Sequence, residues 1–299
     1  MAAPVPFVRE MDFAYGEVQR VSPLIRRVVA NNPGPFTFRG TGVYIVGAGV
    51  VAIIDPGPDL PDHIETLRRA IADERVAAIL VTHRHLDHSP AARPLAQATG
   101  AAIHASGIAP RVSLDDFVAE AGDDLGFAPD VAIGDGATIS GPGWTLEAIA
   151  TPGHTSDHLC FALREENALF SGDHIMGWST TVISPPDGDM DDYLTSLDKV
   201  RERAFATLWP THGPPVRNVA SFIDAYKAHR LDREAQILAQ LAMGKARIME
   251  MVPAIYADVD QRLHPAAAHS VLAHLIRLAK LGRVTCHGAP GIGSDYALA

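Results

Sequence analysis

The 299-residue chain has little of what marks a secreted or membrane protein. Its two cysteines, Cys160 and Cys286, lie far apart in the sequence, which excludes a disulfide framework and favours a reducing compartment. The first residues lack a basic segment followed by an apolar one, so we expect neither a signal peptide nor a membrane anchor. The longest apolar run begins at Val43, but Gly47 and Gly49 interrupt it and it is too short to span a bilayer. We therefore expect a cytoplasmic protein, with a β-hairpin in this run.

Basic charge is also scarce. The net charge at pH 7 is −10, and the excess of acid lies in residues 1–218, whereas residues 219–299 are slightly positive. This distribution disfavours nonspecific capture of a polyanion by the N-terminal part. The C-terminal part has no arginine-rich or aromatic-rich segment of the kind that binds nucleic acid, so we expect no sequence-specific DNA binding. A hydrophobic content of 47% is typical of a folded globular protein.

The order of strand-like and helix-like segments indicates an α/β fold. Short β-rich runs between Glu17 and Asp55, separated by glycine and proline, predict an antiparallel meander. The hydrophobic spacing then predicts a helix over residues 58–73 capped by Asp59, a buried strand over 76–82, a helix over 89–100 ended by Gly100, and a strand over 101–105. A second half of similar layout runs from residue 145 to residue 215, so we expect a duplicated sandwich.

The C-terminal part differs in character. Helical spacing returns in residues 219–243, 246–251 and 264–282, and a β-like stretch follows at 283–288. Three helices and a short strand pair are the layout of a winged helix, so we predict two domains, residues 1–218 and residues 219–299. The alternative is that the helical tail serves only as a packing cap on the first domain.

One acidic segment, residues 106–130, has weak periodicity. It contains Asp115, Asp116, Glu120, Asp123 and Asp124. This composition is compatible with a lid or an inserted helix over a binding site, but a solvated surface loop explains it equally simply and is favoured.

A dense histidine cluster follows the predicted strand 76–82. The stretch VTHRHLDHSP places His83, His85, Asp87 and His88 within six consecutive positions. Packed imidazoles lose solvation and repel one another once protonated, so such a cluster is costly unless a cation binds it. Three further residues each follow an apolar run and are flanked by glycine or proline: His154, Asp173 and His212. These seven side chains predict a metal site built from several strand ends, with zinc as the first choice and manganese or iron as alternatives.

The ordered motifs HxHxDH (His83 to His88), GH (His154), GD (Asp173) and THG (His212) resemble those of the metallo-β-lactamase-fold hydrolases. This resemblance implies an αββα four-layer sandwich that holds two metal ions. It assigns one ion to His83, His85 and His154, the second to Asp87, His88 and His212, and a bridging role to Asp173. Two such ions would share a hydroxide at neutral pH that acts as the nucleophile, and Asp87 would orient it as the catalytic carboxylate.

Members of this superfamily fall into branches that act on different substrates. A bridging Asp173 departs from the β-lactam-degrading members and resembles the glyoxalase II, lactonase and phosphodiesterase branches. Residues 184–200, the LWPTHGPPVRN segment and the helical tail resemble the group around β-lactamase-like protein 2, which includes thioesterases and a single-stranded RNA endonuclease. We expect a hydrolase of a small thioester or ester. An RNA endonuclease is the alternative, and a noncatalytic metal-binding module is a remote third.

Two residues beyond the metal ligands are candidates for contact with substrate. His174 directly follows Asp173, and Trp178 lies in the same loop. A hydrogen bond from His174 to a metal ligand would explain this histidine equally well, and packing in the core would explain Trp178 equally well. An RNA substrate would also need a path of basic side chains to the metals, which Arg84, Arg111, Arg217 and the C-terminal lysine and arginine residues could supply. The oligomeric state stays open.

Overall fold

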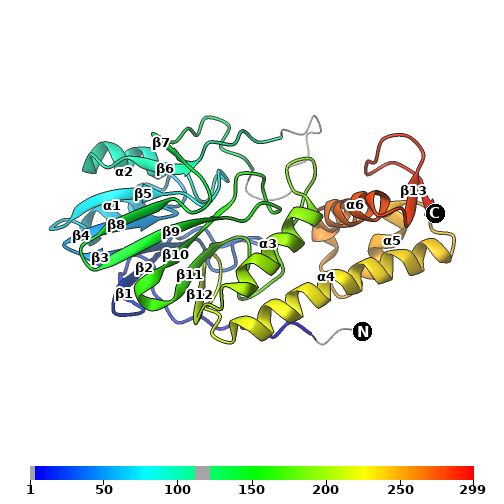
Figure 1. Cartoon of the computed structure of the whole chain (residues 1–299), viewed down its shortest axis with the longest axis horizontal. Coiled ribbons are helices and arrows are strands. Elements are labelled where there is room, and N and C mark those ends of the chain that lie inside the picture. Colours follow the sequence, from blue (N-terminus) through cyan, green and yellow to red (C-terminus); the bar gives the residue numbers. More distant parts are fainter. Residues whose placement is uncertain (1–3, 112–121) are drawn as a thin grey trace.

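The computed structural model describes residues 4–111 and 122–299. Two β-sheets pack face to face, and helices cover the outer side of each sheet, so that four layers follow one another in the order α, β, β, α (Figure 1). A helical part at the C-terminal end extends away from the sheets (Figure 1). The predicted four-layer α/β sandwich with a helical C-terminal part is therefore confirmed.

The first sheet has seven strands in chain order. They are β1 (Gln19–Arg20), β2 (Ile25–Val29), β3 (Gly42–Ala48), β4 (Val50–Ile54), β5 (Arg75–Leu80), β6 (Ile103–Ser106) and β7 (Val131–Ile133). The strands from β1 to β4 pair antiparallel, and those from β4 to β7 pair parallel. The hairpin predicted from the apolar run is formed by β3 and β4, and its turn contains Gly49 at a φ of +70°, which glycine adopts without strain.

The second sheet has five strands in the order β12-β11-β10-β9-β8. They are β8 (Thr138–Gly141), β9 (Trp144–Ala150), β10 (Leu159–Leu163), β11 (Ala168–Gly172) and β12 (Thr207–Pro210), with a short 3-10 helix, η1 (Arg164–Glu166), between β10 and β11. Strand β12 pairs parallel to β11, whereas the other neighbours are antiparallel. Apolar side chains of both sheets, such as Tyr44, Leu80 and Phe161, form the core between the two sheets.

Helices α1 (Pro61–Ala70) and α2 (Ala92–Thr99) cover the first sheet. The predicted Asp59 cap is wrong, because Leu60 is the capping residue of α1 and makes no side-chain hydrogen bond. Pro61 instead starts the helix, and its fixed φ suits that position. Helix α2 ends as predicted at Gly100, whose φ is +73°.

The second sheet is covered by α3 (Met190–Glu202) and by the first half of α4 (Val219–Ala242). The remaining elements are α5 (Ile248–Ile255), η2 (Gln261–Leu263), α6 (His264–Lys280), β13 (Val284–Cys286) and β14 (Tyr296–Leu298). Phe222 and Ile223 of α4 pack in the core beside the second sheet, whereas Ile237 and Leu241 pack with α5 and α6. Since α4 contributes to both cores, a boundary between residues 218 and 219 stays a prediction.

The acidic segment is described only in part. Asp115, Asp116 and Glu120 lie outside the described residues, so the lid or inserted helix predicted there stays a prediction. Asp123 and Asp124 lie beside the histidine loop, where Ser89 Oγ donates a hydrogen bond of 2.9 Å to Asp124. Within the described residues, no helix is both long and apolar enough to cross a bilayer.

Candidate metal centre

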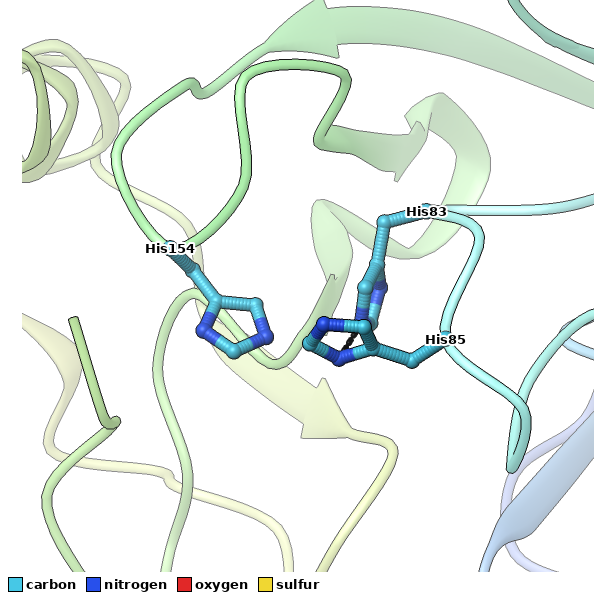
Figure 2. Close-up of side chains that lie close together, drawn as sticks. All are labelled: His83, His85 and His154. Atoms are coloured by element: carbon cyan, nitrogen blue, oxygen red, sulfur yellow. Dashed lines mark hydrogen bonds between the residues drawn. The ribbon is translucent and has the colours of Figure 1, made fainter. Parts of the chain in front are cut away.

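The seven candidate ligands come from loops that follow strands of both sheets. His83, His85, Asp87 and His88 lie in the loop between β5 and α2, and His154 lies in the loop between β9 and β10. Asp173 follows β11 directly, and His212 comes two residues after β12. Figure 2 shows the rings of His83, His85 and His154 converging from two of these loops. The three ring centroids lie 4.5 to 4.9 Å from one another.

The described residues contain three overlapping groups whose candidate ligand atoms all lie within 4.8 Å of one another. The groups are His83, His85 and His154; His83, His88 and Asp173; and Asp87, His88 and His212. The first and third are the sets that the family resemblance assigns to the two ions. The second contains Asp173 together with one histidine from each of the other two sets. All seven candidates are therefore brought together, and their role as ligands stays a prediction.

The donor atoms fit divalent cations. Among the described residues, His88 Nε2 and Asp173 Oδ1 are buried without a hydrogen-bond partner. His88 Nε2 lies 3.6 Å from a carboxylate oxygen of Asp87 and equally far from one of Asp173. Buried polar atoms are rarely left unbonded in a stable fold. Imidazole nitrogens mixed with carboxylate oxygens are the donor set that zinc and similar borderline ions prefer.

The electrostatics differ between the two sides of the site. Burial lowers the pKa of His83 well below its usual value, and it lowers the pKa of His154 to about 4. Burial also lowers the pKa of His88, but nearby carboxylates, with Asp87 the strongest, raise it well above the usual value. Burial raises the pKa of Asp87, but the charges of His88 and His212 outweigh this and lower it to about 2. The first side thus presents neutral nitrogen lone pairs, and the second presents an ionised carboxylate.

Asp55 is the residue that holds this arrangement and that the sequence analysis missed. It directly follows β4, has a φ of +48° and is fully buried. Its carboxylate accepts hydrogen bonds from the Thr82 amide at 2.7 Å, from the hydroxyls of Thr82 and Thr211 at 2.8 Å, and from His88 Nδ1 at 2.9 Å. Because Nδ1 of His88 is engaged, Nε2 is the nitrogen that faces the other candidate ligands. The signal in the sequence was an aspartate that ends an apolar strand.

Other supports come from the backbone. His154 Nδ1 donates to the carbonyl of Val182 at 2.8 Å, and His212 Nδ1 lies 3.2 Å from the carbonyl of Gly40. His158 lies behind the site, since its Nε2 accepts a hydrogen bond of 3.2 Å from the Asp173 amide. In each case a neighbouring group fixes the orientation of a ring or of a ligand-bearing backbone.

The two residues predicted to contact substrate lie in different surroundings. His174 is fully buried and its ring lies 5.1 Å from that of Tyr193, and its contact with substrate stays a prediction. Trp178 is half-buried and stacks on Phe38 with ring centroids 4.9 Å apart. It also lies against Gly213, where an added Cβ would come within 2.9 Å of the indole. Trp178 is therefore adjacent to the loop of His212, and its contact with substrate stays a prediction.

Known proteins share this fold and these segments. Residues 37–212 match the Metallo-beta-lactamase superfamily, and residues 248–292 match the Beta-lactamase associated winged helix domain. The chain is similar to a Beta-lactamase-like protein 2 homolog of Caenorhabditis elegans, with 33% identity over 89% of this chain and 88% of the relative. It is 30% identical to an atrochrysone carboxyl ACP thioesterase of Aspergillus chevalieri over 87% of this chain and 82% of the relative.

A solved structure shows the same fold over nearly the whole length. The crystal structure of a Beta-lactamase domain protein from Burkholderia ambifaria superposes with a TM-score of 0.79 and 20% identity, over 97% of this chain and 96% of the other. The order of elements, the histidine and aspartate groups and the two matching segments lead to the same conclusion. The chain belongs to the metallo-β-lactamase superfamily of hydrolases and carries the winged helix domain associated with it.

Proposed function

We propose that the protein is a two-metal hydrolase that acts on small thioesters or esters. The observation that supports this most directly is the overlap of the three ligand groups, which share His83 and His88. His83, His85 and His154 would hold one ion, and Asp87, His88 and His212 would hold the second. Asp173 would bridge them, since it lies within reach of members of both sets. Zinc suits this donor set best.

The chemistry of the site follows from its donors. Divalent ions held in this way supply a water of lowered pKa and polarise the carbonyl of an ester or thioester. Asp87 would also orient the attacking water by accepting a hydrogen bond from it, because the carboxylate is held ionised. The buried Asp55 and the backbone carbonyls behind the histidines keep the ligands in place, which lowers the cost of assembling the site.

Charge and similarity favour a small substrate over RNA. Arg84, one candidate for a basic path, is buried and forms an ion pair of 3.0 Å with Asp157, so its charge is already neutralised within the protein. The acidic balance of residues 1–218 opposes a polyanion. Relatives named as carboxyl ACP thioesterases support a thioester as the substrate class.

A substrate panel with measured metal content tests the proposal. The protein is freed of metal, reloaded with zinc, and assayed on an acyl thioester, a lactone, bis-p-nitrophenyl phosphate and single-stranded RNA. We expect two bound ions per chain, thioester or ester hydrolysis that depends on them, and loss of turnover after chelation. Cleavage of RNA alone would establish the nuclease alternative, and two bound ions without activity on any substrate would favour the binding module.

A further inference from the structure

The segment that connects Asp173 to Val182 contains neither helix nor strand, yet it is largely buried. It carries the candidate bridging ligand at one end. At the other end, the Val182 carbonyl accepts the hydrogen bond from His154 Nδ1. Backbone groups of a buried irregular segment must find partners elsewhere in the fold. The partners of this segment include two side chains of α4.

Tyr226 supplies three of these hydrogen bonds with a single hydroxyl. The oxygen accepts from the Met176 amide at 3.3 Å and from the Thr181 amide at 3.2 Å. The hydroxyl proton is donated to the Ser179 carbonyl at 2.6 Å. The side chain is fully buried, and burial raises its pKa, so the hydroxyl stays protonated and available as a donor.

Arg230 lies one turn further along α4 than Tyr226, and its side chain also binds Thr181. Its guanidinium donates to the Thr181 carbonyl, and it lies 5.1 Å from the ring centroid of Tyr193. Thr181 is therefore fixed at its amide by Tyr226 and at its carbonyl by Arg230. Residues four apart on a helix lie on one face, which is why both side chains reach the same peptide units.

Thr181 also contacts residues that carry or orient the candidate ligands. Its hydroxyl donates to the carbonyl of Asp173 at 2.6 Å and lies 3.2 Å from that of His174. The next residue, Val182, offers the carbonyl that fixes the His154 ring. Two candidate ligands from different loops thus depend on the placement of one residue.

We propose that Tyr226 and Arg230 are positioning residues of the metal centre, which act through Thr181 to place Asp173 and the ring of His154. This inference rests on the proposed two-metal function. It makes the long helix that leads into the winged helix domain a support of the site.

The support is one-sided. His88 is held by Asp55, which also accepts a hydrogen bond from Thr211, and His212 faces the carbonyl of Gly40. In the described part of the chain, no residue from Asp173 to Val182 takes part in these hydrogen bonds. Because Asp173 would contact both ions and His154 only one of them, a disturbance of α4 should weaken the ion held by His83, His85 and His154 more than the other.

The test compares four variants of the full chain. Tyr226→Phe removes the hydroxyl at constant shape, and Thr181→Val removes the link to Asp173. Thr181→Ser keeps that link and is the conservative rescue. Tyr256→Phe is the matched control, since Tyr256 packs with α5 and α6. Metal-free samples are titrated with Zn²⁺ by calorimetry and with Co²⁺ by visible absorption, and circular dichroism checks that each variant is folded.

We expect Tyr226→Phe and Thr181→Val to weaken one of two binding events about tenfold, at the lower end of the loss seen when supports of metal ligands are removed. The Co²⁺ spectrum of that event should change, and the other event, which shares Asp173, should weaken by a smaller factor. Thr181→Ser and Tyr256→Phe should stay close to wild type in both events. If Tyr226→Phe fails to fold, Thr181→Val alone decides. Unchanged affinities, or equal weakening of both events, would overturn the inference while leaving the two-metal function intact. A wild-type protein that binds fewer than two ions would overturn both.

Discussion

Replacement of Asp55 by asparagine probes how the fold holds the candidate ligands. Asparagine is the suitable substitute because it tolerates the left-handed backbone conformation that Asp55 adopts at a φ of +48°. Alanine would add backbone strain to the loss of the carboxylate. The change therefore removes one acceptor and the negative charge while it preserves shape.

The magnitude follows from the four hydrogen bonds that the carboxylate accepts. One oxygen faces the Thr82 amide, and the other faces His88 Nδ1 and the hydroxyls of Thr82 and Thr211. The threonine hydroxyls can rotate to accept a hydrogen bond from the NH₂ group of the asparagine. The Thr82 backbone N–H can only donate, and His88 Nδ1 can accept only when it carries no proton. Either amide orientation thus leaves a mismatched donor. Loss of a charge-assisted bond plus one unsatisfied buried donor costs roughly 2–4 kcal/mol.

Two assays measure the outcome. Urea unfolding of the metal-free protein should show a free energy of unfolding lower by about 2–4 kcal/mol. Zinc affinity should fall roughly 10–100-fold, because His88 loses the carboxylate that holds Nδ1 and directs Nε2 toward the other candidate ligands. The exposed Asp73→Asn is the matched control and should leave both values unchanged. If Asp55→Asn matches this control in both assays, the carboxylate does not set the orientation of His88.

Removal of His83, which belongs to two of the three ligand groups, should reduce the bound zinc and abolish hydrolysis; unchanged metal content by emission spectrometry would contradict its role. Burial raises the pKa of the Cys160 thiol to about 12, so a thiol reagent at pH 8 should label only Cys286 in the native protein, and mass spectrometry that finds Cys160 labelled as fast would show that the core opens. Burial raises the pKa of Asp189, but the hydrogen bonds from Lys280 and from the amides of Asp191 and Asp192 together outweigh it and lower that pKa. These contacts therefore stabilise the fold above the unfolded value of about 3.9, and their effect is lost as pH falls through the lower folded value. The difference in Tm between wild type and Asp189→Asn should therefore be constant near neutrality and shrink below about pH 4, and a difference that persists in strong acid would refute this linkage.

The sequence predicts that the candidate ligands lie close together, because much of the information is local. His83 to His88 lie within one loop, and Asp173 and His212 follow short apolar runs that form β11 and β12. Once two sheets pack face to face, the loops that follow those strands meet at one edge. The ending of α2 at Gly100 was predictable for a similar reason, since a left-handed residue after a helix is typically glycine.

What the sequence does not predict depends on contacts between distant segments. Asp55 reaches Thr211 across 156 positions, and Tyr226 reaches Met176 across 50. An aspartate after a strand and a tyrosine on the apolar face of a helix have ordinary explanations in turn formation and core packing. Only the assembled fold shows that the carboxylate and the hydroxyl are saturated by groups next to the candidate ligands.

Helix α4 explains why the two parts of the chain are hard to divide. Its first half packs Phe222 and Tyr226 into the core beside the second sheet, and its second half packs Ile237 into the core of the winged helix part. Ion pairs between α6 and α3 join the same two parts, with Arg277 Nε 2.7 Å from Asp191. A cut at residue 218 would expose the apolar surface under Phe222 and remove the side chains that hold Thr181. We therefore expect a chain that ends at residue 218 to be less stable than one that keeps the start of this helix, and the boundary itself stays a prediction.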